Sequence, residues 1–150
     1  MRFLIQRVTK ASVSVDGEII GSIDKGFLVF IGVCAEDTAA EADKLIRKLL
    51  GMRIFQDENG KTNLSLDDVD GQLLLISQFT LYADCKKGNR PSFIKSGSAE
   101  HAEKLYEYII ASCRAQKPDI KIETGSFGAD MKVSLLNDGP FTVMLDSAEL

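Results

Sequence analysis

The sequence predicts one α+β domain, residues 1–150, with a strongly curved, barrel-like and mainly antiparallel sheet and two main helices. Short apolar stretches bounded by turn signals outnumber the two stretches with helical periodicity. Many strands with few helices favour this class. No linker, repeat or low-complexity segment divides the chain, and its 150 residues, 45% of them hydrophobic, are enough for one buried core.

The chain is expected to open with strands. A short apolar stretch spans residues 3–8, and two further apolar stretches are separated by Asp16-Gly17, a strong signal for a two-residue hairpin turn. Residues 27–33 are continuously apolar, which is typical of a short strand covered on both faces.

Two segments have the pattern of amphipathic helices. The first begins at a capping box, Thr38-Ala39-Ala40-Glu41, and its apolar residues recur every three or four positions up to Met52. The second is expected from Ser98, as its N-cap, to about Gln116, because Lys117-Pro118 cannot continue a helix.

Strands and turns fill the rest of the chain. A turn is expected at residues 57–60, and an apolar strand at 73–76 runs directly into Ser77-Gln78-Phe79-Thr80. Residues 84–98 are basic and polar and are expected to form a loop. Three last strands are expected around residues 120–122, 131–135 and 141–145, with Asn137-Asp138-Gly139-Pro140 separating the final two.

Composition limits the partners and the location of the protein. The net charge of -4 and the pI near 5 give no general attraction to phosphate, so a nucleic acid would need a local basic patch. The N-terminus becomes polar too early for a signal peptide, and no apolar stretch approaches the roughly 18 residues of a membrane span. We therefore expect a soluble, cytoplasmic protein that does not contact a membrane.

The chain lacks the residue patterns of a metal site. Cys34, Cys85 and Cys113 are widely spaced, form no CxxC pair and have no clustered histidines beside them. We expect all three to be reduced thiols that pack as small buried hydrophobic side chains.

A nucleophile activated by a neighbouring base is also missing from the sequence. The only histidine, His101, falls in the first turn of the second expected helix, where a solvated or capping role is expected. The acidic runs Glu36-Asp37 and 67–70 lie in polar turns and are expected to be solvated. No GxSxG elbow, HExxH motif or phosphate-binding glycine loop is present. If the protein is an enzyme, its substrate must already be activated or must supply a catalytic group.

Three short runs have both a functional and a structural interpretation. Ser77-Gln78-Phe79-Thr80 places polar side chains at a strand end, where sheet proteins often bind ligands, or it marks a strand that becomes an edge. Asn137-Asp138-Gly139-Pro140 is a plain hairpin turn, or it contains a Gly-Pro bond that can be cis at a small cost in free energy. Lys86 to Phe93 is a solvated basic loop or a contact for phosphate.

Taken together and in order, six fragments of the chain resemble the D-aminoacyl-tRNA deacylase family, and they span nearly its whole length. The fragments are Gln6-Arg7-Val8, Ala11-Ser12-Val13, Ser77-Gln78-Phe79-Thr80-Leu81, Arg90-Pro91-Ser92-Phe93, Ala129-Asp130-Met131 and Asn137-Asp138-Gly139-Pro140. The resemblance implies an editing hydrolase that cleaves the ester bond of D-aminoacyl-tRNA, and also glycyl-tRNA mischarged on tRNA(Ala). It implies no cofactor and no metal.

The resemblance also implies a homodimer whose sites exist only in the dimer. Gly139-Pro140 of one subunit, with its peptide bond cis, would enter the pocket of the other subunit and reject L-amino acids. The implied catalytic set is Ser77, Gln78, Phe79 and Thr80, which line the acyl and ribose region. The implied substrate-binding set is Gly139, Pro140 and Asn137, with Arg7 orienting the Gly-Pro segment and Phe127 and Met131 near the terminal adenosine.

Three mechanisms or roles remain open from the sequence. An aminoacyl ester is intrinsically activated, so the favoured reading is hydrolysis assisted by the neighbouring ribose 2′-hydroxyl, with backbone N–H groups near Phe79 and Thr80 stabilising the developing charge. A second is an esterase that uses Thr80 as nucleophile. A third is a non-catalytic, dimeric nucleic-acid-binding module that uses the Lys86 to Phe93 loop.

Overall fold

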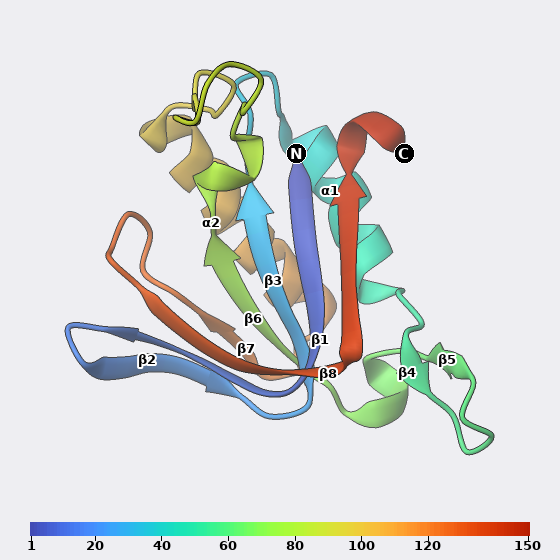
Figure 1. Cartoon of the computed structure of the whole chain (residues 1–150). Coiled ribbons are helices and arrows are strands. Elements are labelled where there is room, and N and C mark those ends of the chain that lie inside the picture. Colours follow the sequence, from blue (N-terminus) through green and yellow to red (C-terminus); the bar gives the residue numbers. More distant parts are fainter.

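A long, bent strand, β1 (Arg2–Val15), organises the fold (Figure 1). In this computed structural model, which describes residues 1–150, a six-stranded sheet has the order β2-β1-β3-β6-β7, and β8 pairs with the opposite edge of β1. The pairs of β1 with β2, β3 and β8 are antiparallel, and the pairs β3–β6 and β6–β7 are parallel. The other strands are β2 (Glu18–Ile23), β3 (Gly26–Gly32), β6 (Gln72–Ser77), β7 (Ile122–Thr124) and β8 (Lys132–Asp146).

The sheet curves until its two ends nearly meet. A Cβ placed on Gly21 of β2 would lie 2.8 Å from the carbonyl oxygen of Thr124 in β7, so only glycine allows this approach. A Cβ on Gly26 would overlap the backbone of Gln72, which β3 meets in parallel pairing. The predicted α+β class, with a barrel-like and mainly antiparallel sheet, is confirmed.

Two helices cover one face of the sheet, as the sequence predicts (Figure 1). α1 (Ala39–Leu50) begins at the expected capping box, and α2 (Ala99–Gln116) begins at Ser98, whose Oγ accepts a hydrogen bond from the N–H of His101. Alternate residues of β3 face either these helices or a second, smaller core on the opposite face, so this strand is covered on both sides. Neither helix is long and apolar enough to cross a membrane.

The expected turns are present, and short elements accompany them. Asp16-Gly17 joins β1 to β2 with positive φ at both residues, which confirms the predicted hairpin. The turn at 57–60 joins two short strands that were not predicted. These are β4 (Phe55–Gln56) and β5 (Thr62–Leu64), and single 3-10 turns form η1 (Asp67–Val69), η2 (Phe79–Tyr82) and η3 (Ser147–Glu149).

The prediction of two strands separated by a turn near the C-terminus is wrong. β8 is one strand, and residues 138–141 bulge out of it instead of reversing the chain. The register with β1 shifts there, since Gln6 faces Thr142 but Val8 faces Asn137. The side-chain amide of Asn137 donates to the carbonyl oxygens of Arg7 (2.9 Å) and Phe141 (3.0 Å), which fixes the bulge at both ends. The Gly139-Pro140 peptide bond within the bulge is cis.

The expected burial of several side chains is also corrected. Asp37 is buried, because its carboxylate accepts hydrogen bonds from the Met1 ammonium (2.6 Å) and the N–H of Cys34 (2.7 Å). Cys113 is buried, and this burial raises the pKa of its thiol to about 11, but Cys34 is half-buried and Cys85 lies exposed on a loop. His101, expected to be solvated or to cap the helix, is half-buried, and its Nε2 is buried without a hydrogen-bond partner.

One hydrogen bond ties α2 to β6 and gives a stability prediction. The hydroxyl of Tyr106, in the core, donates to the carbonyl oxygen of Leu75 at 2.7 Å. We expect Tyr106→Phe to lower the free energy of unfolding by about 1 kcal/mol in urea denaturation. Tyr108→Phe is the matched control, because the exposed Tyr108 hydroxyl bonds to Asp43 at the surface and should contribute less than about 0.5 kcal/mol. Equal losses for both variants would contradict this assignment.

Candidate active site

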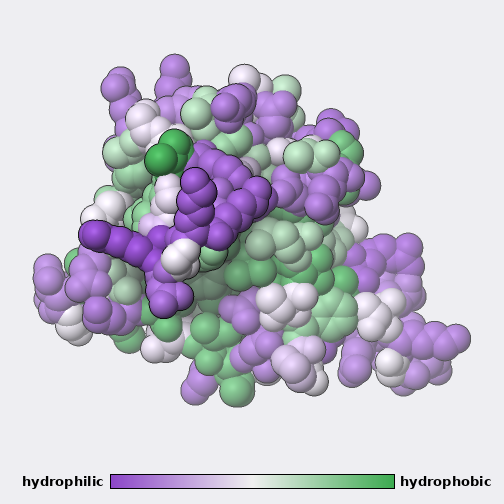
Figure 2. All heavy atoms as spheres, turned by 45° about the horizontal axis from the view of Figure 1, so that its top comes forward, coloured by the Kyte–Doolittle hydropathy of each residue, from purple (hydrophilic) through white to green (hydrophobic).

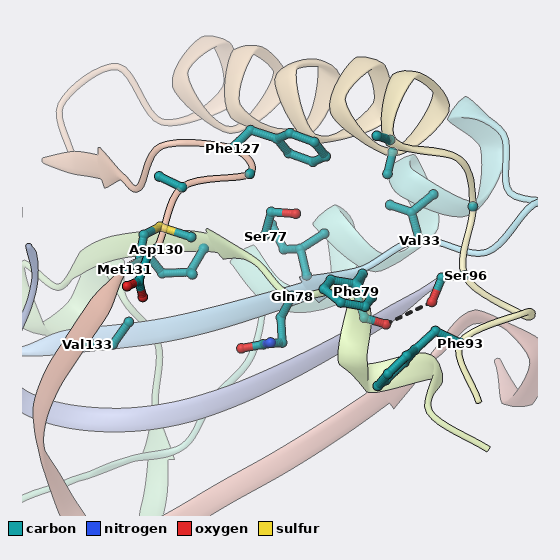
Figure 3. A pocket seen from close by; sticks show the side chains of 17 residues that line it. Val33, Ser77, Gln78, Phe79, Phe93, Ser96, Phe127, Asp130, Met131 and Val133 are labelled. Atoms are coloured by element: carbon teal, nitrogen blue, oxygen red, sulfur yellow. Dashed lines mark hydrogen bonds between the residues drawn. The ribbon is translucent and has the colours of Figure 1, made fainter. Parts of the chain in front are cut away.

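A pocket of about 590 Å³ opens where β3 and β6 end (Figure 3). Eleven of its 17 lining residues are hydrophobic, so its wall is mainly apolar with a few polar groups, as in most ligand sites. The side chains come from the ends of β3 and β6, from the first turn of α2 and the segment that leads into it, and from the start of β8 and its connection to β7. They include Ile31, Val33, Ile76, Ser77, Gln78, Phe79, Phe93, Ser96, Ala102, Phe127, Met131 and Val133.

Three of the four residues in the predicted catalytic set line this pocket. β6 ends at Ser77, and the N–H of Gln78 donates to the carbonyl oxygen of Ile31 (2.7 Å), which holds the chain against β3 as it leaves the sheet. Phe79 then begins η2, and its carbonyl oxygen accepts a hydrogen bond from Ser96 Oγ (3.0 Å), drawn as a dashed line in Figure 3. β6 lies between β3 and β7, but its pairing with β7 ends at Leu75, so only β3 pairs with Ile76 and Ser77.

Thr80 lies outside the pocket. It is exposed on η2, and its hydroxyl oxygen accepts a hydrogen bond from Gln78 Nε2 at 2.6 Å. The contact holds the Gln78 side chain next to η2, so Thr80 supports a residue that lines the pocket.

Phe127 and Met131 line the opposite wall, between β7 and β8 (Figure 3). The ring of Phe127 packs on Tyr106, with ring centroids 6.0 Å apart, and so is attached to α2. Burial raises the pKa of Tyr106 to about 12, and its hydroxyl donates to the carbonyl oxygen of Leu75 in β6. This wall is therefore fixed by the core beneath it.

Gly139 and Pro140 do not line the pocket of their own chain. They are exposed on the bulge of β8, whereas the pocket lies at the end of β6. The nearly buried Arg7 holds the bulge, since its Nε donates to the carbonyl oxygen of Asp138 (3.0 Å) and its Nη1 to that of Ile54 (2.6 Å). Its guanidinium also lies 4.8 Å from the ring centroid of Phe141. Arg7 and Asn137 thus position Gly139-Pro140, but away from Ser77 and Gln78.

No side chain in the pocket is arranged as a nucleophile with its base. Asp130 is the only titratable residue of the lining, and its carboxylate is exposed and pairs with Lys132 (2.9 Å). No three His, Cys, Asp or Glu side chains come together as a metal site would require. The pocket can hold apolar and aromatic groups and offer hydrogen bonds from Ser77, Gln78 and the backbone.

A family model described as D-Tyr-tRNA(Tyr) deacylase matches residues 4–146. The chain belongs to the D-Tyr-tRNA(Tyr) deacylase family. The resemblance stated from six sequence fragments is thereby confirmed.

Relatives in this family align along the whole chain. The chain is 54% identical to a D-aminoacyl-tRNA deacylase from Clostridium novyi (strain NT) over 147 residues, which cover 98% of this chain and 97% of the relative. It is 53% identical to a D-aminoacyl-tRNA deacylase from Thermosipho melanesiensis over 150 residues, which cover 100% of this chain and 99% of the relative.

Two solved structures share the fold. A structure named c-Myc DNA Unwinding Element Binding Protein superposes with a TM-score of 0.91 at 41% identity, over 97% of this chain and 98% of that one. A probable eukaryotic D-amino acid tRNA deacylase superposes with a TM-score of 0.83, over 96% and 97% of the two chains. At 17% identity, the second likeness shows the fold alone.

One end of the Lys86 to Phe93 run lies in the pocket of this D-Tyr-tRNA(Tyr) deacylase family member. Phe93 lines the pocket and packs edge-on against Phe79, with ring centroids 5.0 Å apart. Several other lining residues were not singled out in the sequence. Val33, Ser96 and Ala102 carry no local signal, because only the fold brings them to the end of β6.

Proposed function

We propose that this chain is a cytoplasmic editing hydrolase that cleaves the ester bond of D-aminoacyl-tRNA and releases the free D-amino acid and tRNA. The observation that carries the proposal is the pocket beside Ser77-Gln78-Phe79, a concave apolar site without a paired nucleophile and base, in a member of this family. Its volume of about 590 Å³ lies within the usual range for sites that bind small ligands. In the proposal, Phe127 and Met131 hold the terminal adenosine, and the residues after β6 hold the ester.

Selection for the D form is assigned to Gly139-Pro140 of a second subunit in a homodimer. The two residues are exposed, held by Arg7 and Asn137 and outside the pocket of their own chain, and in the proposal a second copy of the chain brings them to its site. All D-amino acids share an ammonium group, a carbonyl and a handedness. Backbone carbonyls of Gly139-Pro140 bind the ammonium, and the same segment leaves no room for an L side chain, so selection comes from a clash with the wrong substrate.

In the proposal, the substrate supplies the group that assists hydrolysis, and the protein holds the reacting groups in place. The ester is activated, and the neighbouring ribose 2′-hydroxyl assists the attack of water once both are held in place. The first N–H groups of a helical turn have no acceptor within it, so those of Phe79 and Thr80 in η2 are suited to stabilise the developing oxyanion. Thr80 is not the nucleophile in this proposal. Its hydroxyl oxygen accepts a hydrogen bond from Gln78 and lies outside the pocket, which supports that assignment.

Glycine should escape the rejection of L-amino acids, because it has no side chain to clash. We therefore expect glycyl-tRNA, including glycine mischarged on tRNA(Ala), to be deacylated much faster than L-alanyl-tRNA by the same protein. Release of radiolabelled amino acid from the two substrates measures the ratio, and uncatalysed hydrolysis of each is subtracted. Rates for glycyl-tRNA no higher than for L-alanyl-tRNA would contradict the steric rule.

A further inference from the structure

The loop of residues 84–95 carries a local positive charge on an acidic protein. It contains four of the 18 Lys and Arg residues but only one of the 22 Asp and Glu residues, while the whole chain has a net charge of -4. Lys95 pairs with the one carboxylate, that of Asp84, at 3.3 Å. Lys86, Lys87 and Arg90 are exposed and take part in no ion pair, so their charges are available to an anion.

The base of this basic loop (residues 84–95) is fixed by hydrogen bonds. The backbones of Asp84 and Ser92 exchange two of them, at 2.8 and 2.9 Å. One oxygen of the Asp84 side chain also accepts the N–H of Lys86 at 3.0 Å. The three free cations therefore project from a turn with a closed base, so a bound strand would not have to order a disordered segment.

The basic loop lies at the edge of the pocket. Phe93 lines the pocket and packs on Phe79, which is 55% exposed, while the next residue, Ile94, is 90% exposed. Figure 2 shows hydrophilic side chains gathered beside a hollow with hydrophobic walls. Exposed aromatic and apolar side chains next to unpaired cations are the combination that binds single-stranded nucleic acid, because bases stack while phosphates meet the cations.

We propose that the basic loop binds the single-stranded RNA segment that leads to the pocket. Lys86, Lys87 and Arg90 contact its phosphates, and a base packs on the exposed surface of Phe93 and Ile94. The inference rests on the proposed function, in which the ester sits at the end of such a strand. The acidic remainder of the chain repels RNA elsewhere, so the loop also steers the strand toward the pocket.

The test is a triple variant, Lys86→Gln with Lys87→Gln and Arg90→Gln, assayed on D-tyrosyl-tRNA. We expect KM to rise about tenfold or more near 0.15 M salt, with little change in kcat, because phosphate contacts contribute to binding. The plot of log(kcat/KM) against log[salt] should become less steep by about 2, since each contact to a single strand contributes about 0.7. The matched control is Lys48→Gln with Lys61→Gln and Lys104→Gln, three exposed lysines without ion pairs, which should leave both values unchanged.

A second substrate separates RNA binding from damage to the pocket. The ester of D-tyrosine with adenosine alone carries no phosphate, so the loop variant should hydrolyse it as fast as the unmodified protein does. Unchanged KM and salt dependence on tRNA would overturn the inference, as would equal losses on both substrates. Inorganic phosphate gives a third result that would overturn the inference. If millimolar phosphate raised the KM of the unmodified protein for tRNA as much as the triple substitution does, the loop would bind any free anion. If the unmodified protein released D- and L-tyrosine equally, the proposed function would fail, and the effect of the loop on tRNA binding could still be measured.

Discussion

Replacing Gly139 with alanine should lower kcat/KM for D-aminoacyl-tRNA by about a hundredfold or more. Gly139 has φ +130°, which L side chains rarely adopt, and an added Cβ would lie 2.9 Å from Arg7 Nη2 and 3.2 Å from the Phe141 nitrogen. Arg7 cannot easily yield, because two backbone carbonyls hold its guanidinium. The bulge must move instead, and a shift of about 1 Å in a positioning group can cost about a hundredfold in rate.

Gly60→Ala provides the control for this prediction. Gly60 also has positive φ (+74°), but an added Cβ would meet nothing within 4 Å, and the residue lies in the turn between β4 and β5. Gly60→Ala should therefore introduce an alanine at positive φ without loss of activity. Thermal unfolding of both variants shows whether each is folded. Full activity in a folded Gly139→Ala protein would refute the role assigned to the bulge.

A D-aminoacyl-tRNA that ends in 2′-deoxyadenosine should be hydrolysed at least about a thousandfold more slowly than the ribose substrate, because the assisting hydroxyl is gone. Thr80→Ala should keep its rate on the ribose substrate within about tenfold. Its hydroxyl is exposed, lies outside the pocket and touches only Gln78 among the polar side chains. Single-turnover release of amino acid, corrected for the uncatalysed rate of each ester, measures both effects.

Binding must be checked for the deoxy substrate, since loss of the hydroxyl could also weaken affinity. Its inhibition constant against ribose D-tyrosyl-tRNA gives that affinity directly. If Thr80→Ala abolished hydrolysis while the deoxy ester still reacted, Thr80 would be the nucleophile and the substrate-assisted mechanism would be wrong.

Local signals were enough for much of the fold. The capping box at Thr38, the cap at Ser98 and the Asp16-Gly17 turn satisfy backbone groups within a few residues, so sequence neighbours decide them. β8 could not be predicted in this way. Residues 137–140 have the composition of a turn, but pairing with β1, a strand far away in the sequence, keeps the chain extended on both sides of the bulge.

Burial of polar groups also depended on distant partners. Asp37 lies in a polar run, and the opposite charge that compensates its burial comes from the Met1 ammonium, 36 residues away. The pocket also depends on residues that are far apart in the sequence. Ser77 to Phe79 could be found from one short run, whereas Val33 and Ser96 reach the pocket only through folding. The position of Gly139-Pro140 relative to a pocket depends on a second copy of the chain in the proposal, and no local pattern encodes that.

The most direct test compares D-tyrosyl-tRNA and L-tyrosyl-tRNA side by side with the purified protein at the same concentration. We predict rapid release of D-tyrosine, while L-tyrosine is released no faster than in buffer. Equal release of the two amino acids would contradict the account.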